Sequence, residues 1–139
     1  ALDWAPSLEL TRRHGIAILG AGPRDLIGAV PEELLLGACR DELAEWASYE
    51  AHWSLPGGVL AACRAWWFWE EGGLGSKIAA AAWALVRADP ADAVLIERAL
   101  DLYWQAVPHD ITAREVITFV GNVERKISPS RPDPGGPGL

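Results

Sequence analysis

The sequence has few of the residues that bind metals or form cross-links. Methionine is absent from the 139 residues, and there are two cysteines, Cys39 and Cys63. They lie far apart and form no Cys-x-x-Cys pair, so the sequence predicts neither a disulfide framework nor a zinc site. The three histidines, His14, His52 and His109, are scattered, which argues against a histidine-based metal cluster. We therefore expect this chain to bind no metal.

Positive charge and long apolar runs are also scarce. Lys and Arg together number 12 against 19 Asp and Glu, which gives a net charge of -7 at pH 7. A domain of that sign repels a phosphate backbone, which disfavours general nucleic-acid binding. The longest apolar run, Ile78 to Val86, is too short to span a bilayer and is not N-terminal as a signal peptide would be. These absences predict a soluble, cytoplasmic domain with no nucleic-acid or membrane partner.

The hydrophobic pattern indicates helices throughout. Half of the residues are hydrophobic, enough for a packed core, and no segment shows the alternation typical of a half-buried strand. Glycine and proline breaks and a Ser76 cap separate helices at about residues 6–18, 31–46, 56–71, 77–87, 91–106 and 112–127. The chain is thus predicted to be all-α. We expect an antiparallel bundle of about five to six helices over residues 1–128, then a flexible Pro/Gly-rich tail over 129–139.

Lys77 occupies an unusual place at the start of a predicted helix. A cation there faces the positive end of the helix dipole, which costs about 0.3–1 kcal/mol unless an anion offsets it. Ser76 and the glycine-rich stretch from Gly72 to Gly75 precede it, and together these groups suit a phosphate contact. The stretch is not a P-loop, because its spacing is short and Ser precedes Lys. A solvated surface lysine remains the alternative.

A second candidate site follows the predicted helix that Trp46 ends. An irregular segment comes next and contains Glu50. An aromatic face beside a carboxylate suits a cationic sugar, because guanidinium or ammonium groups can stack on the ring and pair with the acid. The alternative is a hydrophobic contact at the helix end with solvated polar neighbours.

Several stretches, taken in order, carry a family resemblance. They are residues 13–20, 30–33 and 41–46, the run 64–83 continuing to Tyr103, and residues 124–127. In this order and spacing the chain resembles the C-terminal helical domain of the aminoglycoside (3'')(9) adenylyltransferases, which modify streptomycin and spectinomycin. The resemblance covers nearly the whole chain apart from the tail.

The resemblance implies a division of labour between two domains. In the family, an N-terminal nucleotidyltransferase domain carries the Gly-Ser motif, the Mg²⁺-binding acids and the catalytic carboxylate. The helical domain closes over the ATP and supplies much of the antibiotic site. By this resemblance Lys77 and Tyr103 are nucleotide contacts, and Trp46 and Glu50 are antibiotic contacts.

The resemblance also implies which part of the reaction this chain lacks. By this resemblance the chain holds no catalytic residue. Alone, the chain is expected to be inactive and to bind neither ATP nor Mg²⁺. Ser54 and Gly57 stand where the family has an acid and a histidine, which puts recognition of the same drug in question. We expect a substrate-binding domain of an aminoglycoside adenylyltransferase without its catalytic half. The alternative is a stand-alone, non-catalytic domain that binds an aminoglycoside-like ligand or serves as a helical interaction module.

Overall fold

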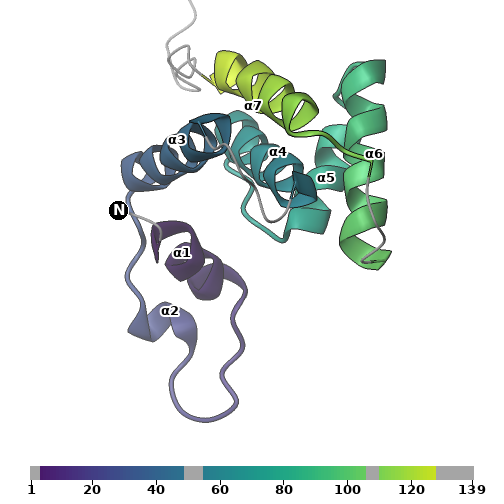
Figure 1. Cartoon of the computed structure of the whole chain (residues 1–139). Helices are drawn as coiled ribbons and strands as arrows, with labels where there is room; N and C mark the ends of the chain where they lie inside the picture. The colour runs from purple at the N-terminus through teal and green to yellow at the C-terminus, as the bar shows by residue number, and fades with distance from the viewer. Residues whose placement is uncertain (1–3, 49–54, 106–109, 128–139) are drawn as a thin grey trace, which may run out of the picture.

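The chain folds into α-helices joined by short connections (Figure 1). The computed structural model describes residues 4–48, 55–105 and 110–127. In these ranges the helices are α1 (Trp4–His14), α2 (Pro23–Leu26), α3 (Glu32–Ser48), α4 (Leu55–Glu71), α5 (Lys77–Leu85), α6 (Pro90–Gln105) and α7 (Ala113–Ile127). The predicted all-α class is confirmed, with seven helices in the described ranges where about five to six were expected. None of them is long and apolar enough to cross a membrane.

Helix α4 is the centre of the molecule, with α3, α5, α6 and α7 packed around it (Figure 1). Its residues are buried on nearly every side, from Val59 and Leu60 to Phe68 and Trp69. A helix that is apolar on all sides is stable only when other elements surround it. The apolar sequence of this segment therefore explains its central position. The amphipathic α7 instead buries one stripe, which includes Val116, Phe119 and Val123.

The N-terminal part differs from the expectation. Helix α1 contacts α2 and α3 and packs against the edge of the central bundle, where Ala5 forms a buried cluster with Leu35 and Phe68 (Figure 1). It ends at His14 rather than at Ile18, and the four-residue α2 was not predicted. Gly15, whose N–H still bonds the Thr11 carbonyl at 2.8 Å, is followed by β-branched residues and by Gly20 at φ 84°. Glycine has low helix propensity, and the positive φ of Gly20 lies outside the helical region, which together account for the early end.

Helix α7 begins with a reciprocal cap that ties it to α6. The Thr112 N–H donates to Glu115 Oε2 at 2.8 Å, and the Glu115 N–H donates to Thr112 Oγ1 at 3.2 Å. From α6, Arg98 Nη1 donates to Glu115 Oε1 at 2.8 Å. The Arg98 guanidinium, followed by the Thr112 donors, lowers the pKa of Glu115 to about 2.

This cap should make part of the stability depend on pH. The folded pKa of Glu115 lies below its ordinary value of 4.5, so the ionised group stabilises the fold above about pH 4.5. That contribution is lost as the pH falls towards about 2. Glu115→Gln should therefore be less stable than wild type at pH 7, and the difference should shrink over this window. Thermal melts followed by circular dichroism measure it, with the exposed Glu97→Gln as control; a pH-independent difference would contradict the assignment.

Candidate functional site

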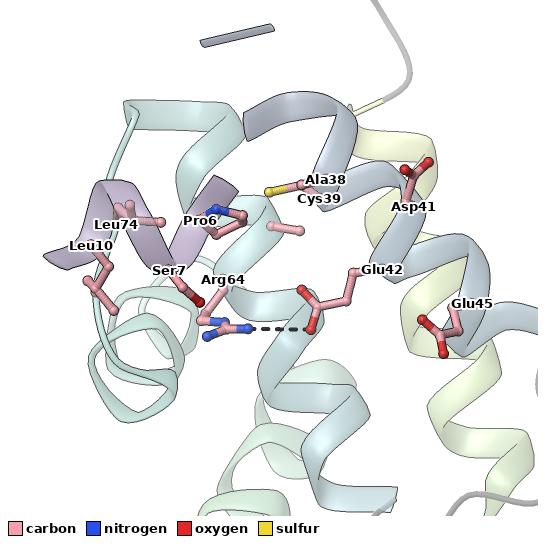
Figure 2. Close-up of a pocket in the computed structure, with 12 residues that line it drawn as sticks. Pro6, Ser7, Leu10, Ala38, Cys39, Asp41, Glu42, Glu45, Arg64 and Leu74 are labelled. Atoms are coloured by element: carbon pink, nitrogen blue, oxygen red, sulfur yellow. Dashed lines mark hydrogen bonds and ion pairs between the residues drawn. The ribbon is translucent and has the colours of Figure 1, made fainter. Parts of the chain in front are cut away.

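A cavity of about 240 Å³ lies between α1, α3, α4 and the loop before α5 (Figure 2). Pro6, Ser7 and Leu10 line it from α1, and Leu74 and Gly75 line it from the loop. Its remaining lining residues come from α3 and α4, and they include Cys39, Asp41, Glu42, Glu45 and Arg64.

The two long walls of this cavity carry opposite charges. Asp41, Glu42 and Glu45 belong to α3, and Arg64 reaches in from α4 (Figure 2). Arg64 Nη2 lies 3.4 Å from Glu42 Oε1, and each of these side chains keeps about a third of its surface exposed. An ion pair this long and this exposed is weak, so the guanidinium remains available to an anionic ligand.

Lys77 lies beside this cavity as the first residue of α5. The preceding Ser76 caps the helix, since its hydroxyl oxygen accepts from the Ala79 N–H at 3.1 Å. The Lys77 side chain is half-buried, and its pKa is lowered, first by burial and then by the positive charge of Arg64. Glu42 offsets part of this effect. A cation in the first turn of a helix, with a second positive charge close enough to lower its pKa, is in a position that an anion would stabilise.

Sequence reasoning did not single out Arg64 as a site residue, although a signal was present. It is the one charged residue between Leu55 and Trp69. A cation in the central apolar helix needs a partner, and here it finds Glu42 and the mouth of a cavity. Its proximity to Lys77 depends on how α4 packs against α5, which the sequence pattern does not reveal.

The glycines before Lys77 have a packing role. Gly72 adopts φ 68°, in the left-handed region, and its N–H donates to the Phe68 carbonyl at 2.8 Å, which ends α4. Gly73 lies so close to Trp67 that any Cβ would fall on the indole ring, and at Gly75 a Cβ would come within 3.0 Å of it. The glycines therefore let the loop cross the face of Trp67 and bring Lys77 to the cavity.

The ring beneath the loop belongs to a tryptophan cluster. Trp67 stacks on Trp83 with ring centroids 6.4 Å apart, and Trp66 meets Trp83 edge to face at 5.2 Å. The Arg87 guanidinium carbon lies 4.3 Å from the Trp83 ring centroid, on the solvent side of the cluster. Such aromatic contacts fix ring orientations, so the loop rests on a defined surface.

Helix α1 holds the same loop from the other side. Glu9 is buried and accepts from Arg12, from Arg13 Nε at 2.7 Å and from the Val30 N–H at 3.1 Å. Arg13 Nη1 then donates to the Gly72 carbonyl at 3.0 Å, and His14 Nε2 lies 3.2 Å from the Leu74 carbonyl. The loop before Lys77 is thus tied to α1 at two points.

The predicted site residues are not all brought together. Trp46 packs against the core, and a Cβ at Gly58 would lie 2.6 Å from its Cε3. Tyr103 is 48% exposed near the end of α6 and does not line the cavity beside Lys77. Glu50 lies outside the described residues. The antibiotic and nucleotide roles of these residues remain predictions.

The described residues can also be compared with the arrangement that a metal ion needs. Across residues 4–48, 55–105 and 110–127, no group of three or more His, Cys, Asp or Glu side chains is arranged to hold a metal. Both thiols are also poor ligands and nucleophiles, because burial raises the pKa of Cys39 and of Cys63 to about 12.

Comparison with known proteins supplies the family. No curated protein matches the chain. The family model described as "Aminoglycoside adenylyltransferase, C-terminal domain" matches residues 25–126, which include the loop before α5, Arg64 and Lys77. Since the match covers well over half of the chain, the protein belongs to the aminoglycoside adenylyltransferase family and carries its C-terminal domain.

Proposed function

We propose that this chain binds the substrates of an enzyme that transfers AMP from ATP to an aminoglycoside such as streptomycin or spectinomycin. In this proposal a separate nucleotidyltransferase domain supplies Mg²⁺ and the catalytic carboxylate. The observation that carries it is the half-buried Lys77 at the capped start of α5, close enough to Arg64 of α4 for that charge to lower its pKa. A lysine at a helix N-terminus with an arginine of the neighbouring helix in electrostatic reach suits the phosphates of a nucleotide.

The reaction explains why cations are needed at this place. A hydroxyl oxygen of the antibiotic, whose proton the catalytic carboxylate of the other domain would accept, attacks the α-phosphorus of ATP, and the bond from that phosphorus to the pyrophosphate oxygen breaks. Negative charge then develops on the leaving pyrophosphate. Arg64 can hold two phosphate oxygens at once, and Lys77 acts as a point charge beside the backbone N–H groups of the helix start. Their role is to bind and orient the phosphates and to stabilise this charge.

The antibiotic side of the proposal rests on acids. Asp41 and Glu45 are exposed at the cavity, and with Glu42 they give α3 a negative face. Such a face attracts the ammonium and guanidinium groups of an aminoglycoside to the neighbourhood of the nucleotide. Trp46 and Glu50 remain the predicted direct contacts, and Tyr103 remains a predicted contact of the nucleotide.

This function can be tested by joining the chain to the nucleotidyltransferase domain of a family member. The kinetics of AMP transfer by the joined enzyme are then measured. Lys77→Met should raise the KM for ATP at least about tenfold, since a charged contact to phosphate contributes about 1.5–3 kcal/mol. The Tm should stay within about 2 °C, because the lysine pays a desolvation cost in the fold and has no ion pair among the described contacts.

The matched control is Arg114→Met. Arg114 is also a cation in the first turn of a helix, but it belongs to α7 and is exposed away from this cavity. It should leave the KM for ATP unchanged. An unaltered KM in Lys77→Met, with activity intact, would show that Lys77 is a solvated surface residue and would remove the main support for the proposal.

A further inference from the structure

The loop before α5, residues 72–75, is held by the C-terminal end of α1. Arg13 Nη1 donates to the Gly72 carbonyl at 3.0 Å, and His14 Nε2 lies 3.2 Å from the Leu74 carbonyl. The Leu74 side chain also packs against the buried cluster that α1 forms at the edge of the bundle. Apart from the bond of the Gly72 N–H, which closes α4, the hydrogen bonds that reach this loop from described residues come from α1. Helix α1 therefore sets the path by which the chain enters α5.

The Arg13 side chain is itself fixed by a buried carboxylate. Glu9, one turn earlier on α1, accepts from Arg13 Nε at 2.7 Å. A guanidinium group is planar, so the bond at Nε also sets the direction in which Nη1 points. Glu9 is held in turn by Arg12 and by the Val30 N–H. The contact with Gly72 thus comes from a side chain whose orientation is determined within α1.

On its other side the loop rests on Trp67. Gly73 and Gly75 approach the indole so closely that a Cβ at either position would meet the ring. The loop is therefore enclosed between α1 and this ring, and it leads directly to Lys77. Loss of the Arg13 contact would free the loop to lift from the ring and would displace Lys77 with it.

We propose that Arg13 is a positioning residue for AMP transfer, which holds Lys77 in place against the nucleotide phosphates through the Gly72 carbonyl. The inference rests on the proposed function in taking Lys77 as the phosphate contact. Arg13 is not itself a phosphate contact in this proposal, since its Nε and Nη1 are bound to Glu9 and Gly72 and it does not line the cavity. Helix α1 precedes residues 25–126, so this role belongs to a part of the chain outside the matched domain.

Steady-state kinetics of the joined enzyme test this role with two matched variants, Arg13→Met and Arg12→Met. Both remove an arginine that binds Glu9, but only Arg13 also reaches the loop. Both arginines are partly exposed and lie outside the central bundle, so both variants should fold.

Arg13→Met should raise the KM for ATP at least about fivefold, because displacement of a binding group weakens its contacts with the substrate. The kcat, with streptomycin or spectinomycin as the acceptor, should change by less than about twofold, since a loss of substrate binding alone acts on KM. Arg12→Met should leave the KM for ATP unchanged.

A double variant shows whether Arg13 acts through Lys77. In the Lys77→Met background the phosphate contact is already absent, so Arg13→Met should change the KM for ATP by less than about twofold. A rise that persists in this background would overturn the inference, because Arg13 would then act on another group.

Two further outcomes would also overturn the inference. They are an unchanged KM for ATP in Arg13→Met and an equal rise in Arg12→Met, which would reflect a general loosening of α1. The proposed function is decided separately. If Lys77→Met raises the KM for ATP and Arg13→Met does not, the positioning role fails and the nucleotide site stands. If Lys77→Met has no effect, the proposed function fails and the positioning role fails with it.

Discussion

Gly73→Ala should lower the free energy of unfolding by about 1–3 kcal/mol, the usual cost of overpacking a filled site. A Cβ at this position would fall on the Trp67 indole ring. Trp67 cannot retreat easily, because it stacks on Trp83 in the tryptophan cluster. The loop must therefore lift from the ring, which also displaces Lys77. Urea unfolding measures the loss, and the joined enzyme should show a raised KM for ATP as well.

Two other glycines provide the controls. At Gly28 an added Cβ would meet nothing within 4 Å and the φ is not positive, so Gly28→Ala should change stability by less than about 0.5 kcal/mol. At Gly72 there is space but φ is 68°, so Gly72→Ala should cost about 1–2 kcal/mol through backbone strain alone. Equal effects at Gly73 and Gly28 would show that the loop does not rest on Trp67.

The helices of the bundle were predictable because their signals are local. Ser76 caps α5 as expected, and α7 begins at Ala113, next to the expected start at residue 112. Each signal depends on residues within one or two helical turns. The early end of α1 was missed because a short apolar run between glycines does not distinguish the end of a helix from a non-helical segment.

The cavity was not predictable in the same way. Its charged lining residues come from α3 and α4, which meet through helix packing, and Lys77 of α5 is affected by the charges of Arg64 and Glu42. The sequence identified Lys77 from its unfavourable helix position, which is a local property. It did not identify Arg64 as the neighbour of Lys77. It also gave no sign that the glycines before Lys77 accommodate the Trp67 ring.

Glu9→Ala should release α1 from the rest of the fold. Glu9 is 2% exposed and accepts hydrogen bonds from two arginines and from the Val30 N–H. The Arg12 and Arg13 donors hold its pKa far below the ordinary range, so the buried group is ionised. Its removal leaves the Val30 N–H without its acceptor. Arg12 and Arg13 are 24% and 32% exposed and can turn to water, which limits the cost to about 2–3 kcal/mol.

The loss should be local, and hydrogen exchange is the measurement that reveals this. Helix α1 contacts α2, α3 and the loop, whereas α4 holds the central bundle together. Amides of α1 should therefore exchange faster in Glu9→Ala, while those of α4 and α7 keep their protection. Glu9→Gln should recover part of the effect, because the amide oxygen can still accept from Val30. The exposed Glu97→Gln should change neither region. A uniform loss of protection across α1, α4 and α7 would mean that α1 unfolds together with the bundle, and Glu9 would then stabilise the whole domain.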